Sequence, residues 1–322
     1  MARLTGAIGV GLTVGLLPAL PPFLTRTHAA DSTTHARIQD PRLNECSGLE
    51  RSRRHDGVFW ALNDSGGQPE LFALDAAGRA LGRVRVLGAK NVDWEGITAD
   101  DDGHLYLHDG GNNLNQRRDL VVYRIPEPSA LDGEVTVDQV IPFVFPDQAA
   151  FPPAARNFDS EALFWDEGAL HLLTKHRGDS RTTLRRFPAP RDPGTDAEGR
   201  GTPPGAPVSP PLTLELLGSF ELGGDPDRFG GKVTAADRSP DGAWLAVLTY
   251  HAIFLFPRPA QPGGWLSGTP HRIDLDQLIT QQDEALAWDG DGLLFSNEGG
   301  DLFRIANPLD PGCRRFPAPG CR

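Results

Sequence analysis

The sequence predicts an all-β protein, a β-propeller of five four-stranded blades. One hairpin pattern recurs along the chain and is clearest from Asp93 to Asp109, where an acidic residue, a small residue and an apolar strand lead through an Asp-Gly turn into a second apolar strand. Aligned on their small residue, five copies follow one another at intervals of 48, 66, 74 and 49 residues. A repeat of this order with four strands per unit is typical of a propeller blade.

Each unit shows its elements in the same order. The first strands begin at Ser47-Gly48-Leu49, Glu95-Gly96-Ile97, Glu161-Ala162-Leu163, Ala235-Ala236-Asp237 and Glu284-Ala285-Leu286. The turns that follow pair an acid with glycine, which is the preferred chemistry of a tight hairpin, at Asp56-Gly57, Asp102-Gly103, Glu167-Gly168, Asp241-Gly242 and Asp291-Gly292. Second and third apolar strands come next, such as 105–107 and 120–125 in the second unit.

Fourth strands are predicted for four of the five units, at 84–86, 140–145, 214–220 and 271–275. The fifth unit has none, whereas residues 34–38 read as a strand with no hairpin of its own. We therefore expect this N-terminal strand to complete the last blade and close the ring, which removes open sheet edges. The alternative is a sixth blade built from the insertions at 126–138 and 188–211.

The two ends of the chain are expected to lie outside the blades. Residues 1–30 have the form of a signal peptide, with Arg3, a long apolar run and small residues for cleavage, so a secreted protein is predicted, with a membrane anchor as the alternative. Residues 31–310 then form a single propeller domain. In the tail, residues 311–322, we expect Cys313 to pair with Cys321, and the alternative is a bond from Cys46 to Cys313.

Charge narrows the choice of partners. The 322 residues carry a formal net charge of −12. This excess of negative charge disfavours nucleic acid and anionic membrane surfaces and favours bound cations. After the first segment no stretch has the ~18 apolar residues of a membrane span, so no membrane insertion is expected once the signal is removed. We expect a monomer that binds a small anionic ligand or a component of the cell envelope.

Carboxylates are expected to gather at one mouth of the ring. In an antiparallel blade the start of the first strand and the end of the second lie at the same face, which places Glu95 beside Asp109. The same reasoning brings further residues to this mouth: Asp64, Asp93, Asp159, Glu161, Asp237, Glu284 and Glu298, with Lys175, His176 and Tyr250 among them. So many acids repel one another unless a cation intervenes, and Ca²⁺ is the natural partner in an exported protein.

Charge and position assign three roles at this mouth. The predicted calcium ligands are Glu95, Glu161, Asp237, Glu284 and Glu298. The predicted substrate-binding residues are Asp64, Asp109, Arg117 and Tyr250, and the predicted catalytic residues are Lys175 and His176. For each acid the alternative is a structural role, in which its carboxylate accepts backbone N–H bonds where two blades meet.

Several of these segments resemble those of exported bacterial propellers described as esterase-like phytase relatives and SdiA-regulated proteins. The resemblance covers most of residues 43–306 and lies in 47–49, 60–66, 93–97, 159–163 and 283–285. It implies a propeller, often loaded with calcium, that hydrolyses a phosphoester or another ester. Ser47 and Ala235 depart from the glutamate of the other three units, which argues against a symmetric metal ring.

These observations predict a secreted hydrolase. Calcium held by Glu95, Glu161 and neighbouring acids would orient an anionic phosphate or carboxylate ester for attack by water. Lys175 or His176 would stabilise the negative charge that develops. The alternative is a non-catalytic propeller that binds a glycan, a peptide or an envelope component at the same mouth.

Overall fold

The fold is described from a computed structural model, which describes residues 36–188, 210–225, 228–318 and 321. Residues 33–322 form one compact unit. The predicted signal peptide lies outside the described residues and stays a prediction.

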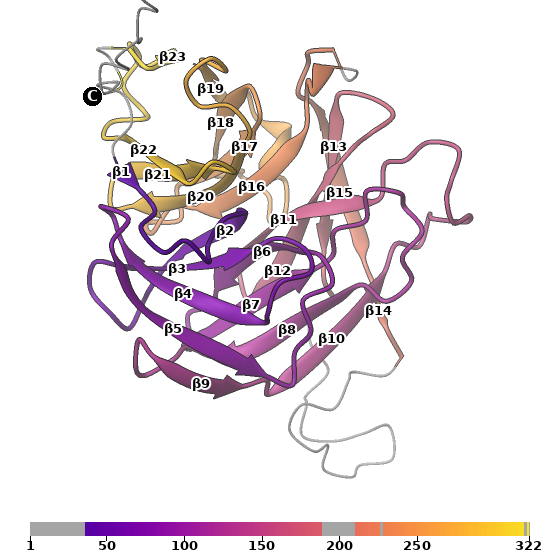
Figure 1. Ribbon diagram of the computed structural model, residues 1–322. Helices are drawn as coiled ribbons and strands as arrows, with labels where there is room; N and C mark the ends of the chain where they lie inside the picture. Colours follow the sequence, from indigo (N-terminus) through magenta and orange to yellow (C-terminus); the bar gives the residue numbers. More distant parts are fainter. Residues whose placement is uncertain (1–35, 189–209, 226–227, 319–320, 322) are drawn as a thin grey trace, which may run out of the picture. The chain divides into compact units, whose positions relative to one another are not determined.

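This unit is an all-β ring of five blades, as the sequence predicts, and Figure 1 follows its strands in chain order. Blade 1 contains β2 (Cys46–Arg51), β3 (Val58–Asn63), β4 (Glu70–Asp75) and β5 (Ala80–Leu87). Blade 2 contains β6 (Trp94–Ala99), β7 (His104–Asp109), β8 (Val121–Pro126) and β10 (Gln139–Val144). Blade 3 contains β11 (Asp159–Asp166), β12 (Ala169–Lys175), β13 (Arg181–Arg186) and β15 (Glu215–Glu221).

The last two blades complete the ring. Blade 4 contains β16 (Val233–Arg238), β17 (Trp244–Thr249), β18 (Ala252–Pro257) and β19 (His271–Leu275), with a short 3₁₀ helix, η2 (Trp265–Ser267), between β18 and β19. Blade 5 contains β20 (Asp283–Asp289), β21 (Gly292–Asn297), β22 (Asp301–Ile305) and β1 (Ala36–Arg37). The first strands β2, β6, β11, β16 and β20 each contact the first strands of both neighbouring blades, so they line the axis.

The N-terminal strand closes the ring, which confirms the prediction from the sequence. Strand β1 pairs antiparallel with β22, with Ala36 opposite Leu302 and Arg37 opposite Asp301. The backbone N–H of Ile38 donates to the carbonyl of Gly300 at 2.8 Å, which extends the contact by one residue. The last blade therefore combines the N-terminal strand with β20, β21 and β22, and β22 keeps no open edge on that side.

Three blades carry a fifth, outer strand that the sequence analysis did not separate. Strands β9 (Gly133–Thr136), β14 (Leu212–Thr213) and β23 (Arg315–Phe316) pair in parallel with β5, β10 and β19, respectively. The strand predicted at 214–220 corresponds to β15 of blade 3, and residues 212–213 just before it form a separate strand of blade 2. In the described residues these pieces widen existing blades rather than build a sixth.

The hairpin turns follow the predicted acid–glycine chemistry, with one shift. Gly57, Gly103, Gly168 and Gly242 have positive φ, as tight turns at these positions require. In blade 5 the positive φ falls on Gly290, and Asp289 pairs with Gly292. The turn is therefore two residues earlier than predicted, because the repeated Asp-Gly offers two equivalent candidates.

Large side chains fill the spaces between and within blades. Trp60 and Trp265 are fully buried, and a buried indole N–H needs an acceptor. Trp60 Nε1 donates to Glu127 Oε1 at 3.0 Å, which ties blade 1 to the segment after β8, and Trp265 Nε1 donates to Asp166 Oδ2 at 2.8 Å, which ties η2 to blade 3. Polar bonds thus fix how neighbouring blades pack.

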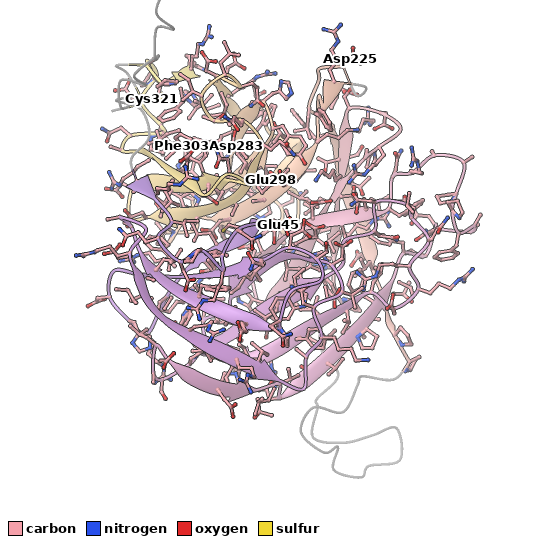
Figure 2. The ribbon with its side chains drawn as sticks, viewed as in Figure 1. Glu45, Asp225, Asp283, Glu298, Phe303 and Cys321 are labelled. Atoms are coloured by element: carbon pink, nitrogen blue, oxygen red, sulfur yellow. A yellow bond between two sulfur atoms is a disulfide. The ribbon has the colours of Figure 1, made fainter. Side chains whose placement is uncertain are left out.

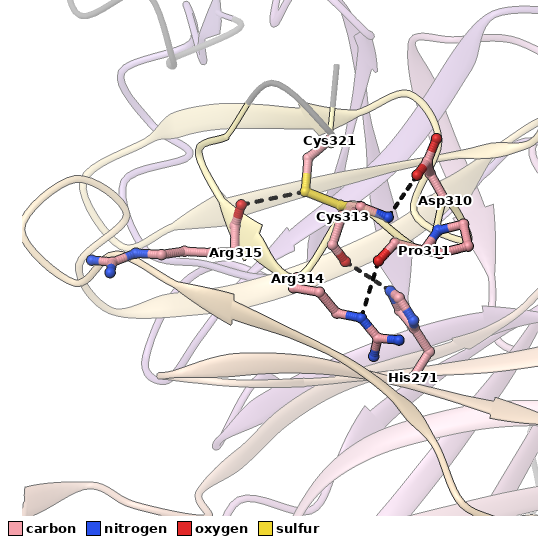
Figure 3. Close-up of a disulfide and its surroundings, with 8 residues drawn as sticks. His271, Asp310, Pro311, Cys313, Arg314, Arg315 and Cys321 are labelled. Atoms are coloured by element: carbon pink, nitrogen blue, oxygen red, sulfur yellow. Dashed lines mark hydrogen bonds between the residues drawn. A yellow bond between two sulfur atoms is a disulfide. The ribbon is translucent and has the colours of Figure 1, made fainter.

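The tail is closed by the predicted disulfide between Cys313 and Cys321. His271 Nε2 lies 2.8 Å from the carbonyl oxygen of Cys313, a bond drawn in Figure 3 that joins this loop to β19. Cys46 is buried and free, so the alternative pairing with Cys313 is not formed. Within the described ranges, no helix has the length and apolarity needed to cross a bilayer.

Candidate functional site

A β-bulge near the start of every first strand brings one residue per blade to the same level of the ring. The pairing register shifts by one residue in all five blades, between 46 and 48, 94 and 96, 160 and 162, 233 and 235, and 283 and 285. A bulge inserts one residue and re-aims the side chains beside it. The inserted residues are Ser47, Glu95, Glu161, Thr234 and Glu284.

The two hydroxyl residues in this set join blades. Ser47 Oγ donates to the carbonyl of Trp94 in blade 2 at 2.7 Å, and Thr234 Oγ1 donates to the carbonyl of Asp283 in blade 5 at 2.8 Å. Of the glutamates at the same position in the other three blades, Glu95 and Glu161 line the axis. A narrow axial cavity lined by Ser47, Glu95 and Glu161, among other residues, begins at this level.

Asp237 does not lie with these residues, which corrects its predicted place. The fourth unit was aligned one residue late, because Ala235 and Ala236 are both small and the bulge falls on Thr234. Asp237 lies three residues further along β16, where its Oδ2 accepts the backbone N–H of Trp288 at 2.8 Å. Its carboxylate therefore connects blades 4 and 5, away from the predicted ligands.

Three carboxylates meet where blades 1 and 2 adjoin. Oxygens of Asp64, Asp93 and Glu95 lie within 4.8 Å of one another. Burial raises the pKa of Asp93 to about 7, and the charges of Asp64 and Asp159 add to the shift. Burial followed by the charge of Glu161 likewise raises the pKa of Glu95 well above its ordinary value. The cluster therefore holds more negative charge than its surroundings neutralise.

Asn91 fixes the geometry of this cluster, and the sequence analysis missed it. Its Nδ2 donates to the carbonyls of Asn63 and Asp64 at 3.1 and 2.7 Å, and its Oδ1 accepts the N–H of Trp94 at 3.3 Å. One amide thus links the loop that carries Asp64 to the strand that carries Glu95. The sequence feature that could have identified it is an asparagine three residues before Trp94, a spacing at which the Asn side chain can accept a backbone N–H and form a turn.

Gly111 lets the backbone approach these carboxylates. It follows β7, and its N–H donates to the carbonyl of Asp93 at 3.1 Å. A Cβ at this position would overlap the side-chain oxygens of both Asp93 and Glu95. Glycine is therefore required here for space rather than for its φ angle.

A buried ion pair lies beside the cluster on the blade 3 side. Lys175 Nζ is 3.1 Å from Glu161 Oε2 and 5.0 Å from the centre of the Tyr250 ring. Burial alone would lower the pKa of Lys175, but the charges of Glu161, Glu284, Tyr250 and Glu95 together outweigh it and raise the pKa, so the ammonium stays protonated. Tyr250 in turn donates to Glu284 Oε1 at 2.7 Å. A chain of polar contacts thus crosses the mouth from blade 3 to blade 5.

One buried oxygen among these polar contacts has no hydrogen-bond partner in the described residues. Glu161 Oε1 is buried and forms no hydrogen bond with the described residues, although Arg177 Nη2 lies 3.9 Å away. Arg177 is committed to Asp159, with its Nη2 and Nε at 2.6 and 2.8 Å from Oδ2. An unsatisfied buried carboxylate oxygen is costly unless a proton, an ion or a ligand meets it.

Four other predicted site residues lie outside the carboxylate cluster: Asp109, Arg117, His176 and Glu298. Asp109 is fully buried, accepts the N–H groups of Val92 and Asp93 at 3.3 and 3.1 Å, and lies 2.9 Å from Arg117 Nη2. This pair fits the structural alternative. His176 Nδ1 lies 2.7 Å from Asp179, and the other charges that shift its pKa belong to Arg185 and Lys232 rather than to the cluster.

Glu298 lies at the exposed rim. Gln282 donates to its carboxylate at 2.9 Å. Partial burial raises the pKa of Glu298, and the charges of Glu284, Asp64 and Glu45 add to the shift. Figure 2 shows Glu298 and Glu45 close together near the middle of the ring. The mouth therefore has an acidic outer rim above the buried pair.

Comparison with known proteins finds solved structures of similar fold but does not assign the chain to a family. No family model matches the chain, and no curated protein matches it. Among solved structures it is similar to the PQQ-bound aldose sugar dehydrogenase from Streptomyces coelicolor, at 13% identity and a TM-score of 0.45, over 84% of this chain and 95% of that one. It is also similar to the periplasmic gluconolactonase PpgL of Pseudomonas aeruginosa, at 17% identity and a TM-score of 0.44, over 83% and 82%.

A third similar structure is virginiamycin B lyase from Staphylococcus aureus, at 11% identity and a TM-score of 0.40, over 84% and 83% of the two chains. At these values the likenesses carry no weight for function. The resemblance to esterase-like phytase relatives stays an expectation from the sequence.

Proposed function

We propose that the mouth binds a divalent cation, with Ca²⁺ as the best match, and that the protein is an exported hydrolase of phosphate or carboxylate esters. The observation that carries this proposal is the position of Asp64, Asp93 and Glu95 directly beside the buried pair of Glu161 and Lys175. A disulfide is typical of oxidising compartments and supports export.

The residues present suit a hard cation. All three clustered side chains offer carboxylate oxygens, which Ca²⁺ prefers, and their mutual repulsion would be relieved by binding it. Gly111 leaves the space that a Cβ would take from Asp93 and Glu95. Glu161 Oε1 adds a buried oxygen with no hydrogen bond from the described residues.

The chain's own residues supply the remaining chemistry. A bound cation would polarise the ester and lower the pKa of a nearby water. Lys175, held positive by Glu161, can stabilise negative charge that develops on the ester oxygen. Glu161 Oε1 can accept a proton from water, and the Tyr250 phenol, held by Glu284, can orient the substrate. His176 is left out, because the charges that act on its ring belong to Asp179, Arg185 and Lys232 and not to the carboxylate cluster.

The charges also suit an anionic substrate. The rim is acidic, so an anion would be held through the cation and through Lys175 and Arg177 rather than by the rim itself. We therefore propose a small anionic ester, free or as part of the cell envelope, and a protein that acts as a monomer.

The first test measures the cation and the reaction separately. Calorimetric titration of the purified protein with Ca²⁺ should show saturable binding, and Ca²⁺ should raise the melting temperature. Hydrolysis of p-nitrophenyl phosphate or p-nitrophenyl acetate should require Ca²⁺ and stop with a chelator. Gly111→Ala should weaken Ca²⁺ binding by about tenfold or more, which corresponds to ~1.4 kcal/mol, because the added Cβ would displace the side-chain oxygens of Asp93 and Glu95.

Matched variants separate the site from general damage. Gly218→Ala is the control for Gly111→Ala, since a Cβ at Gly218 meets nothing within 4 Å. Glu95→Gln, which removes the charge of one proposed ligand, should also weaken Ca²⁺ binding. Its control is Glu134→Gln, at an exposed acid paired with Arg85 at 3.3 Å. If Ca²⁺ binds but no ester is hydrolysed, the non-catalytic ligand-binding alternative replaces the hydrolase. If Ca²⁺ does not bind, the cation site is wrong.

A further inference from the structure

A second cavity lies between blades 4 and 5 at the face of the hairpin turns, opposite the mouth with the carboxylates. Its volume is about 450 Å³. Trp244 and Trp288 form its aromatic part, and its acidic residues are Asp241, Asp291 and Asp310. The aspartates come from the turn between β16 and β17, the turn between β20 and β21, and the segment after β22, and the tryptophans come from β17 and β20. This cavity has no part in the function proposed above.

The walls of this cavity are preformed. Trp288 is 3% exposed, and its Nε1 donates to the carbonyl of Asp237 at 3.0 Å, which fixes the indole ring. Asp241 Oδ1 accepts the Ser239 hydroxyl at 2.5 Å and the N–H of Ala243 at 2.9 Å. The Ser239 bond is the main reason that the pKa of Asp241 is lowered, so this carboxylate stays charged.

The third wall is held by turns and by the disulfide. The N–H of Asp310 donates to the carbonyl of Asn307 at 3.1 Å, and the N–H of Cys313 donates to the carbonyl of Asp310 at 2.8 Å. Asp310 Oδ1 accepts the N–H of Gly312 at 2.7 Å, a bond drawn in Figure 3. A site with fixed walls loses little entropy when it binds a ligand.

The charge of the lining is one-sided. It contains three aspartates and no lysine, arginine or histidine among the described residues. Arg238 and Arg258, which approach the neighbouring Gly242, pair with Asp166 of blade 3 at 3.6 and 2.8 Å. Of the causes that lower the pKa of Asp241, the charge of Arg238 comes last, so the cavity keeps a negative charge that attracts a cation from solution. Trp244, which is partly exposed, offers an aromatic surface to such a cation.

We propose that this cavity binds an organic ammonium ion, with its apolar body against the tryptophans and its positive charge facing the aspartates. A bare metal ion would gain nothing from the indole rings, and an anion would be repelled by all three acids. The volume admits a compact ligand with several carbon atoms, such as a methylated amine or the end of a lysine side chain.

Choline and 3,3-dimethylbutan-1-ol have the same shape, but only choline carries a positive charge. Comparing the two ligands therefore tests whether the cavity recognises the charge. Calorimetric titration of the intact protein should show saturable choline binding and binding of the neutral isostere weaker by about tenfold or more. Raising the salt concentration roughly tenfold, from about 0.05 M to about 0.5 M, should weaken choline binding. Equal binding of the two ligands, or no choline binding, overturns the proposal.

Variants locate the binding. Asp291→Asn should weaken choline binding by about three- to tenfold, since it removes one of three attracting charges. Asp56→Asn, in the corresponding turn region of blade 1, makes the same charge change on the same face and should leave binding unchanged. Trp244→Leu should weaken binding at low and high salt alike. Glu95→Gln should leave choline binding unchanged, so failure here and failure of the proposed hydrolase are distinguishable.

Discussion

The acids of the mouth differ in what their oxygens touch. Asp109 accepts two backbone N–H groups and pairs with Arg117, so its charge is satisfied within the fold. Burial raises the pKa of Asp109, and Arg117 and the two N–H groups oppose that shift. Burial also raises the pKa values of Asp93 and Glu95, and there the neighbouring carboxylates add to the shift. Only the second kind gains from a bound cation, which is why the proposed site contains fewer residues than the predicted ring.

His108 is a buried residue with a measurable effect on pH dependence. Its Nε2 donates to Ser160 Oγ at 3.1 Å, because the Ser160 hydroxyl itself donates to the carbonyl of Gly110. Burial, and then the charge of Arg117, lowers the pKa of His108 to about 3. Between pH 6.5 and 3 the unfolded chain therefore binds a proton at this position that the folded chain does not.

We expect this histidine to destabilise the protein as the pH falls through that window. Its contribution to the slope of the unfolding free energy is about 1.4 kcal/mol per pH unit, with stability rising as pH rises. His108→Gln should remove this part of the slope in denaturant titrations from pH 4 to 7. The control is His251→Gln, at a half-buried histidine. An unchanged slope in His108→Gln would show that His108 is charged in the folded protein.

At the scale of elements, the bulges and the added outer strands carry information that the repeat pattern does not. The bulge determines which residue of each first strand reaches the axis, and it falls on Thr234 in blade 4 rather than on an acid. The outer strands widen three blades. Strand β23 does so for blade 4, where Phe316 lies edge-on to Phe295 and Phe303 with ring centres 5.5 and 6.1 Å apart.

The disulfide whose loop contains β23 should contribute to stability. Its cysteines are eight residues apart, and a loop of this length constrains the unfolded chain by about 2 to 3 kcal/mol. Replacing both Cys313 and Cys321 with serine should lower the unfolding free energy by that amount in urea titrations. Reducing the unchanged protein should reproduce the effect, since the free Cys46 is not bonded. Equal urea midpoints for oxidised and reduced protein would contradict the prediction.

For the whole molecule, the closure of the ring depends on very few residues. Strand β1 has two residues, and Ile38 beyond it is buried with Leu43 and Leu302 in one apolar cluster. Loss of this segment exposes an apolar side chain and the edge of β22. Exposed edges of this kind promote association between molecules.

A chain that begins at Asp40 should therefore be less stable than one that begins at Thr34, by about 2 to 4 kcal/mol, from the burial of Ile38 and the lost backbone bonds. Urea unfolding measures the difference, and light scattering should detect association of the shorter chain. Arg37→Ala is the control, because its ion pair with Asp301 is exposed and should contribute less than about 1 kcal/mol. Identical unfolding of both chains would mean that β1 does not hold the ring closed.

The sequence by itself determined the five blades, the closing strand and the disulfide. These depend on local signals, since alternating apolar residues, acid–glycine turns and closely spaced cysteines can each be recognised within a few dozen residues. It also placed Glu95, Glu161 and Lys175 at one mouth, because strand direction follows from the turns.

The tertiary structure alone decided which acids meet. The position of the bulge in blade 4 places Asp237 away from the mouth, where it accepts a backbone N–H of blade 5. Asn91 donates to the carbonyl of Asp64 and so holds the loop of Asp64 near the strand of Glu95. Asp109 accepts backbone N–H groups instead of joining the carboxylate cluster. The cavity at the opposite face is built from three segments that no local pattern connects. Sites of both kinds depend on distances between blades, and a repeat pattern specifies each blade without specifying how its neighbours are placed.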